Sequence, residues 1–329
     1  TTIQGPLDIH MYDIARIEVL AGPQGTLYGA SAEAGALRII TNKPDPSGFA
    51  ASYALGVNKV GHGGVGFTTE GMLNIPISKS AAVRIVGWRE HDAGYIDNKA
   101  GSRTFPVSGI TVSNADGCTP SATLECFGHA RKHYNDVNTS GARAALKVDL
   151  DDNWSISPTL MGQQTISHGT FASDPSIGDL AVTHFYPERV NDRWWQGALT
   201  VQGKIGNFDL TYAYAHLKRN QEEQTDYNDY SFWYDTLLSY GAYINDNSGA
   251  LINPSEFISD RDGYTNSSHE LRIVSPSEDR LRLVAGAFWQ KQKHDILQNY
   301  QINNLATSLA VPGWPNTIWL TRQMRYDYD

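Results

Sequence analysis

The sequence predicts an all-β membrane protein, an antiparallel transmembrane β-barrel, on three observations. From Phe49 onward, apolar residues recur at every second position, which is the period of a strand with one apolar face. The connections between these segments alternate between tight turns and long polar loops. Only 19% of the 329 residues are charged, yet no apolar run reaches roughly 18 residues, the length that a transmembrane helix needs.

The alternation is clear in the first such segment, where Phe49, Ala51, Tyr53, Leu55 and Val57 alternate with small or polar residues. Nine later segments share this pattern, so about ten strands are expected. They are 49–58, 64–76, 80–91, 139–150, 153–167, 193–205, 207–219, 265–275, 280–293 and 319–329.

The lengths of the connections distinguish a membrane barrel from a soluble β-sandwich. Tight turns are expected at 76–80, 151–153, 205–207 and 276–279. Long polar loops are expected at 92–138, 168–192, 220–264 and 294–318. The loop around 58–63 is short, but its place in the alternation puts it at the same end of the strands as the long loops. Outer-membrane barrels have short periplasmic turns and long extracellular loops, whereas a soluble sandwich, enzyme or adhesin has no reason to alternate in this way.

Residues 13–44 differ from the rest, reading DIARIEVLAGPQGTLYGASAEAGALRIITNKP. Two short apolar runs flank a glycine-rich connector, which predicts paired strands joined by compact turns. The connector lacks the Gly-Lys-Ser/Thr ending of a phosphate-binding loop and the Gly-x-Gly-x-x-Gly spacing of a dinucleotide site.

This stretch closely resembles the end of the plug domain of TonB-dependent outer-membrane receptors. The plug motif comprises Arg16, Glu18, Gly22, Pro23, Gly25, Tyr28, Gly29 and Gly35, followed by Ile39-Ile40-Thr41-Asn42-Lys43-Pro44. The chain departs from the family pattern at Ala21, where Arg or Lys is usual, and at Ala30-Ser31, which are less polar than usual.

The resemblance implies a fragment of a larger receptor. Residues 1–44 would be the C-terminal part of the plug, 45–48 a linker, and 49–329 the N-terminal half of the barrel, with about ten of an expected 22 strands. It further implies a Gram-negative outer membrane, import of a scarce nutrient, and energy supplied by the inner-membrane TonB complex through a segment outside this sequence. No enzymatic activity and no cofactor are expected.

The two cysteines, Cys118 and Cys126, lie in one polar stretch. In an extracytoplasmic loop they would close a small disulfide ring, which the chain-entropy model values at roughly 2–3 kcal/mol. In a reducing compartment they would be free thiols, and that alternative stays open.

No metal site is expected. His129 and His133 lie in a loop-like region without the three or four ligands that zinc needs. Asp226, Asn228 and Asp229 lack the calcium-loop pattern, so a solvated acidic loop is the expectation. The net charge of −9 gives no reason to expect nucleic acid as a partner.

Aromatic residues are the candidates for ligand contact. Most strand aromatics fall on the apolar face, as expected for contact with outer-membrane lipid. Trp88 and Trp194 have the opposite phase, and further aromatics fall in loops. The candidate ligand-binding residues are Tyr28, Ala30, Ser31, Trp88, Trp194, Phe232, Trp233, Tyr234 and Trp314. For each of them, packing within loops or against the barrel wall is the alternative.

A ferric siderophore, an iron chelate, is the expected cargo, because it is the commonest cargo of the family that the chain resembles. Basic residues expected in or beside the outer loops would favour an anionic chelate; they are Arg131, Lys132, Arg189, Arg193 and Arg219. The alternatives are a carbohydrate or cobalamin transporter of the same class, a passive porin, and a soluble all-β protein.

Overall fold

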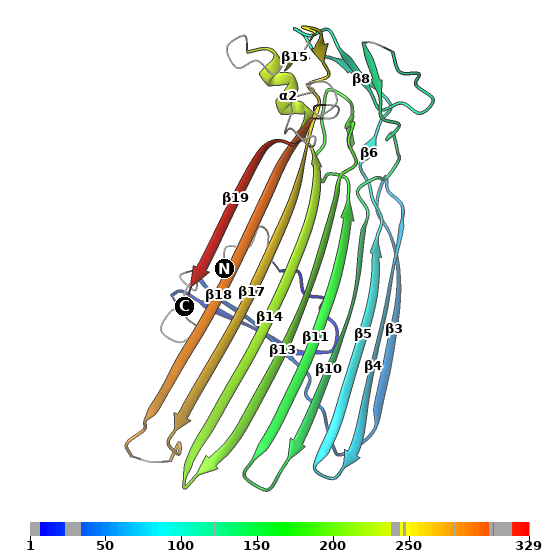
Figure 1. Cartoon of the computed structure of the whole chain (residues 1–329). Helices are drawn as coiled ribbons and strands as arrows, with labels where there is room; N and C mark the ends of the chain where they lie inside the picture. Colours follow the sequence, from blue (N-terminus) through cyan, green and yellow to red (C-terminus); the bar gives the residue numbers. More distant parts are fainter. Residues whose placement is uncertain are drawn as a thin grey trace.

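Ten long antiparallel strands form one curved sheet in the computed structural model of the chain (Figure 1). The structure describes residues 7–23, 34–121, 123–237, 244–245, 248–278, 280–302, 305 and 318–328. Along the sheet the order is β19-β18-β17-β14-β13-β11-β10-β5-β4-β3, so each strand pairs with the next long strand in the chain.

The ten strands confirm the ten predicted from the alternation. They are β3 (Ala50–Lys59), β4 (Val65–Ser78), β5 (Ala81–Asp92), β10 (Val137–Asp149), β11 (Ser155–His168), β13 (Arg189–Ile205), β14 (Phe208–Asp226), β17 (Glu256–Val274), β18 (Val284–Ile302) and β19 (Ile318–Tyr328). Tight turns join β4 to β5, β10 to β11, β13 to β14 and β17 to β18 at one end of the sheet (Figure 1). The long connections gather at the other end, referred to as the outer end.

Four strands extend further toward the outer end than predicted. β14 continues to Asp226, β17 begins at Glu256, β18 continues to Ile302 and β13 begins at Arg189, in regions expected to be loop. These extensions are polar on both faces, as in the Asn-Gln-Glu-Glu-Gln run from Asn220. Without an apolar face there is no alternation to reveal the strand, although the backbone pairing continues.

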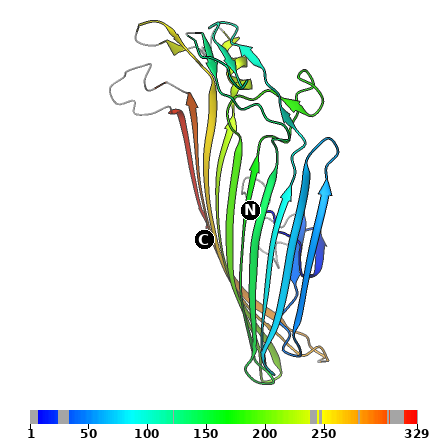
Figure 2. The ribbon, with the colours of Figure 1, turned by 90° about the vertical axis from the view of Figure 1, so that its right-hand side faces the viewer.

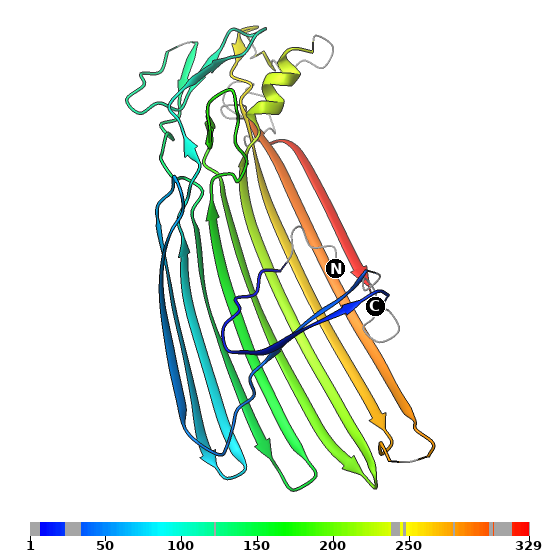
Figure 3. The ribbon, with the colours of Figure 1, turned by 180° about the vertical axis from the view of Figure 1, so that it is seen from behind.

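One face of the sheet carries the N-terminal residues and is referred to as the inner face (Figure 3). Its side chains include Arg84, Trp88, Arg143 and Gln163, which all contact residues 8–13. Side chains of the opposite, outer face are apolar over much of its height; Tyr53, Leu55, Leu160 and Trp195 are examples that remain exposed. The predicted assignment of Trp88 and Trp194 to the face opposite Trp195 agrees with this register.

Strands β1 (Ile14–Ala21) and β2 (Gly35–Thr41) pair with each other and cross the inner face of the large sheet (Figure 3). At Gly35 the backbone has φ of 143° and an added Cβ would lie 2.4 Å from the Leu20 carbonyl oxygen. Only glycine fits this close approach. The region 7–23 together with 34–44 is referred to as the N-terminal segment.

The connection from the N-terminal segment to the sheet is fixed by a buried asparagine. Asn74 donates through Nδ2 to the carbonyl oxygens of Asp45 and Gly48, and its Oδ1 accepts from the Asp45 amide. Its side chain is fully buried, so the predicted linker at 45–48 has a defined path.

The described residues of the three longest connections, 93–136, 169–188 and 227–255, form an outer lobe above the sheet (Figure 2). It contains β6 (Asp97–Asn98), β7 (Ser102–Thr104), β8 (Thr111–Ser113), β9 (Leu124–Cys126), β12 (Ala181–Val182), α2 (Asn228–Asp235), β15 (Ile244–Asn245) and β16 (Leu251–Ile252). Cys118 and Cys126 are joined by a disulfide with a Cα–Cα distance of 5.7 Å. Within the described ranges, no helix is both long enough and apolar enough to cross a membrane.

Candidate functional site

The N-terminal segment is anchored to the sheet through Asp13, which precedes β1. Asp13 has a φ of 55° and directs its carboxylate at two arginines of the inner face. Arg84 donates from Nε at 2.7 Å and from Nη2 at 2.5 Å, and Arg143 donates from Nη2 at 2.8 Å. Arg143 also donates to the Asp13 carbonyl oxygen at 2.9 Å, and Asn42 donates to the carboxylate at 2.8 Å.

This junction is almost sealed from solvent: the side chains of Asp13 and Arg143 are 5% and 2% exposed. Burial opposes ionisation of Asp13, but hydrogen bonds from Arg84 and Asn42 and the charges of both arginines outweigh it and hold its pKa below the ordinary value. The ion pairs therefore form a buried junction between the N-terminal segment and the sheet.

A second anchor lies at His10. Its Nε2 lies 2.5 Å from Glu70 Oε1 and its Nδ1 lies 3.2 Å from Glu90 Oε2, so two strands hold the ring. The ring stacks on Trp88, with centroids 5.5 Å apart and an interplanar angle of 11°. The His10 amide also donates to Gln163.

Trp88 and Trp194, both predicted as ligand contacts, lie in one transverse row of the inner face. The strand register aligns this row through residues directly opposite one another: Glu70, Trp88, Gly141, Gln163, Trp194, Arg219, Tyr264, His294 and Tyr326. A Cβ on Gly141 would lie 2.4 Å from the Trp88 ring, so glycine lets the indole lie flat against the sheet. Trp88 is 6% exposed beneath His10 and Trp194 is 5% exposed.

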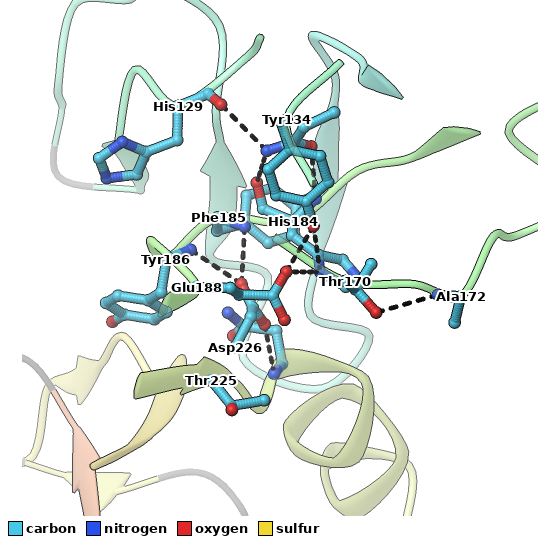
Figure 4. A network of polar contacts seen from close by, with 12 residues as sticks. His129, Tyr134, Thr170, Ala172, His184, Phe185, Tyr186, Glu188, Thr225 and Asp226 are labelled. Carbon is cyan, nitrogen blue, oxygen red and sulfur yellow. Dashed lines mark hydrogen bonds and ion pairs between the residues drawn. The ribbon is translucent and has the colours of Figure 1, made fainter. Parts of the chain in front are cut away.

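The outer lobe contains a buried polar network around Glu188 (Figure 4). Tyr134 donates its hydroxyl proton to Glu188 Oε2, and His184 Nδ1 lies 2.8 Å from the same oxygen. Burial favours neutral His184, but the hydrogen bond to Glu188 and the charges of Glu188 and Asp226 outweigh it and raise the pKa. Burial and the Glu188 charge also raise the pKa of Tyr134.

Asp226 closes the base of the outer lobe. Its Oδ2 accepts hydrogen bonds from the amides of Phe185 and Tyr186 at 2.6 and 2.8 Å, and its Oδ1 accepts from the Asn228 amide (Figure 4). Asp226 therefore acts as a structural acceptor in this loop rather than as the solvated residue expected from the sequence. No group of three or more metal-ligating side chains occurs in the described part of the chain.

The aromatic run at 232–234 divides between core and surface. Phe232 is 3% exposed, stacks on Phe105 at 4.0 Å and lies beneath the Arg103 guanidinium, so it belongs to the lobe core and not to an open binding face. Trp233 is 54% exposed and contacts Tyr234, with ring centroids 5.0 Å apart. The burial of Phe232 was not visible in the sequence because it depends on partners more than 100 residues away.

Several predicted residues lie outside the described ranges, namely Gly25, Tyr28, Gly29, Ala30, Ser31 and Trp314. The described members of the plug motif lie in or beside β1 and β2. Arg16 and Arg38 both contact Glu18, on an exposed part of the segment.

Most of the basic residues expected near the ligand pair with acidic residues or point to the outer face. Arg131 pairs with Asp136, Arg219 is held by Asp192 at 2.7 and 2.8 Å, and Arg189 and Arg193 point to the outer face. The residues predicted from the sequence did not include the anchors Asp13, Arg84 and Arg143, nor His10, Glu70 and Glu90. Their available signal was an isolated charge on the otherwise uncharged central part of a strand, as at Arg84 and Arg143.

Comparison with known proteins identifies the class of fold. No protein-family model matches the chain. A stretch of 39 residues, 11% of the chain, is 51% identical to the pesticin receptors of Yersinia enterocolitica and Yersinia pestis and covers 6% of their length.

Two solved structures are similar over most of this chain. The ferric yersiniabactin uptake receptor FyuA from Yersinia pestis gives a TM-score of 0.61 at 15% identity, over 89% of this chain and 38% of that one. The ferripyoverdine receptor of the outer membrane of Pseudomonas aeruginosa gives 0.52 at 12% identity, over 94% and 37%.

The chain therefore has the fold of part of a TonB-dependent outer-membrane receptor, as residues 13–44 predicted. It spans less than two fifths of the solved receptors that it resembles.

Proposed function

We propose that this chain is part of a receptor that imports a ferric siderophore across the outer membrane of a Gram-negative bacterium, energised through TonB. The observation that best supports this proposal is the position of the N-terminal segment. It crosses the inner face of the sheet and is held there by Asp13 and His10. A passive porin needs no such segment, whereas a gated importer needs an obstruction that can be moved.

This geometry supports the following division of the chain. Residues 1–44 form the end of the plug, 45–48 the linker locked by Asn74, and 49–329 the first half of the barrel. The apolar outer face contacts lipid, and the outer lobe faces the medium.

In this proposal the ligand enters beneath the outer lobe and rests above the N-terminal segment. Trp194 and Tyr264 lie in the same inner row as Trp88, but all three rings are buried, so none of them offers open aromatic surface to a ligand in this structure. Binding involves no covalent step. TonB then moves the plug, which requires the buried contacts of Asp13 and His10 to open.

The cargo class draws support from the proteins of similar fold, whose names give ferric yersiniabactin and ferripyoverdine as ligands. A carbohydrate or cobalamin cargo is the competing assignment. The test compares expression of the complete gene under iron starvation with expression during growth on single carbon sources. Induction by iron starvation is expected; induction by a sugar with no iron response would overturn the iron assignment and leave the transporter class intact.

A further inference from the structure

The outer face of the sheet is charged only toward its outer end. Side chains next to those of the inner row point outward, because successive side chains of a strand point to opposite faces. Leu146, Leu199 and Trp289 lie in one transverse row of outward-pointing residues. From this row to the tight turns, no outward-pointing residue of the described strands is Asp, Glu, Lys or Arg. Charged residues begin in the next row toward the outer end, with Lys291.

The outward-pointing charged residues above that row are mostly basic, although the chain as a whole has a net charge of −9. The basic residues are Lys59, Arg89, Arg189, Arg193, Lys218, Arg261, Lys291, Lys293 and Arg325, and the acidic residues are Glu222, Asp226, Asp295 and Asp327. Asp226 is moreover occupied by backbone amides of the outer lobe. A basic surface therefore borders the apolar part of the outer face.

A groove of about 450 Å³ opens on this basic surface near the outer ends of β5, β10, β11 and β13. The polar residues that line it at outward-pointing positions are Arg89, Asn138, Ser140, Gln164, His168 and Arg189. Among the described residues of the lining, none is Asp or Glu. The groove therefore brings together two arginines from β5 and β13, which are separated in the sheet by β10 and β11.

The two arginines of the groove, Arg89 and Arg189, are exposed and unpaired. Within the described part of the chain, neither guanidinium makes an ion pair or a hydrogen bond. By contrast, Arg325 of the same face donates to Asp295 at 2.8 Å. Guanidinium groups bind phosphate and carboxylate oxygens in a bidentate manner, so both arginines of the groove are available to an anion from outside the chain.

The acids nearest to the groove along the chain do not neutralise these arginines. Asp136 is held by three side chains, those of Arg131, Asn138 and His168. Because Arg131 pairs with it at 2.6 Å, Asp136 brings no net charge to the groove. Glu90 points to the inner face, and Glu188 is buried in the polar network of the outer lobe.

The groove borders the surface that contacts lipid in the proposed function. Arg89 lies in the transverse row directly above that of Trp195, which is 43% exposed. Further toward the tight turns lie Ile85 and Leu160, which are 44% and 57% exposed. An anion that is attached to acyl chains can reach the groove while its chains cover these apolar residues, whereas a free anion gains nothing from them. The position of the groove therefore favours a lipid.

We propose that this groove binds the phosphate group of a lipid in the outer leaflet of the membrane. Arg89 and Arg189 hold the phosphate oxygens, and the hydroxyl of Ser140, which has no hydrogen-bond partner in the described chain, donates to them. The inference rests on the outer-membrane location in the proposed function and adds a lipid site to it. Arg189, expected from the sequence to lie near an anionic ligand, then contacts lipid and not the cargo.

The test is native mass spectrometry of the complete receptor in a neutral detergent, titrated with three probes. Dimyristoyl phosphatidic acid has both phosphate and acyl chains, dimyristoylglycerol has the chains alone, and inorganic phosphate is the anion alone. Phosphatidic acid is expected to bind at least about tenfold more tightly than either of the other probes. The double variant Arg89→Gln with Arg189→Gln is expected to bind phosphatidic acid at least about tenfold more weakly than the wild type.

Arg325→Gln is the matched control, because it removes the same charge from the same face but from an arginine that is paired with Asp295. It should leave phosphatidic acid binding unchanged, and a thermal unfolding curve verifies that each variant is folded. Equal binding of dimyristoylglycerol, full affinity in the folded double variant, or an equal loss in Arg325→Gln would overturn the inference. Inorganic phosphate that binds as tightly as phosphatidic acid would overturn the assignment to a lipid.

Uptake of ferric chelates by cells that express the same receptor is measured in parallel, so that the lipid site and the proposed function are tested separately. Chelate uptake that persists without phosphatidic acid binding would reject the lipid site alone. Specific phosphatidic acid binding without any chelate uptake would reject the proposed iron cargo and support the lipid site.

Discussion

At the scale of single residues, Asp13 makes the most buried of the described ion pairs between the N-terminal segment and the sheet. Replacing it by Asn would leave Arg143, with a side chain 2% exposed, as a buried unpaired charge. Breaking a buried pair on one side costs about 3–5 kcal/mol. Asp13→Asn in the complete receptor is therefore expected to lower the free energy of local opening of β1 and β2 by this amount, measured by hydrogen exchange.

Glu18→Gln is the matched control for that experiment. It removes an acid from the same segment, but its partners Arg16 and Arg38 are 62% and 44% exposed. Exposed pairs contribute about 0–1 kcal/mol, so exchange should hardly change. An equal effect of the two substitutions would show that burial of the Asp13 junction is not what anchors the segment.

His184 is expected to make the stability of the outer lobe depend on pH. Its pKa is raised in the folded state by Glu188 and Asp226, so the stabilisation is complete below the unfolded value of about 6.5 and is lost as pH rises through the folded value. Exchange protection of residues 97–136, corrected for intrinsic rates, is expected to be higher at mildly acidic pH than at alkaline pH. His184→Gln should remove the difference; an unchanged pH profile in that variant would assign the effect to another group.

At the scale of elements, the two faces of each strand should differ in their tolerance of charge. Leu146 of β10 points to the outer face and Thr211 of β14 to the inner face. Leu146→Arg is expected to cost about 2–4 kcal/mol near the bilayer midplane, and Thr211→Arg much less. Urea-induced unfolding of the complete receptor in lipid measures both, and equal costs would contradict the assignment of the faces.

The strands could be predicted from the sequence wherever one of their faces is apolar. They could not be predicted where both faces are polar. Hence all ten strands were predicted, but the outer ends of β13, β14, β17 and β18 were mistaken for loop. The Asp13 junction was missed because its arginines are 71 and 130 residues away, and a single sequence contains no record of such pairing.

At the scale of the whole molecule, β3 and β19 form the two edges of the described sheet and do not pair with each other. Open edges carry unpaired N–H and C=O groups, which the hydrocarbon core of a membrane does not tolerate. Residues 1–329 expressed alone are therefore expected to aggregate in lipid or detergent. A monodisperse, protease-resistant membrane species of this length, detected by size-exclusion chromatography, would contradict the interpretation as part of a larger barrel.

The most direct measurement of the proposed function is uptake of radiolabelled iron by cells whose only siderophore receptor is the complete protein. A panel of ferric chelates that includes amine-bearing and anionic members is offered to TonB-positive and TonB-negative strains. Accumulation of at least one chelate in the TonB-positive strain alone is predicted, since in the proposed function the N-terminal segment blocks passive entry until it is moved. Equal accumulation in both strains would indicate a passive pore, and no accumulation of any ferric chelate would contradict the assignment as an iron importer.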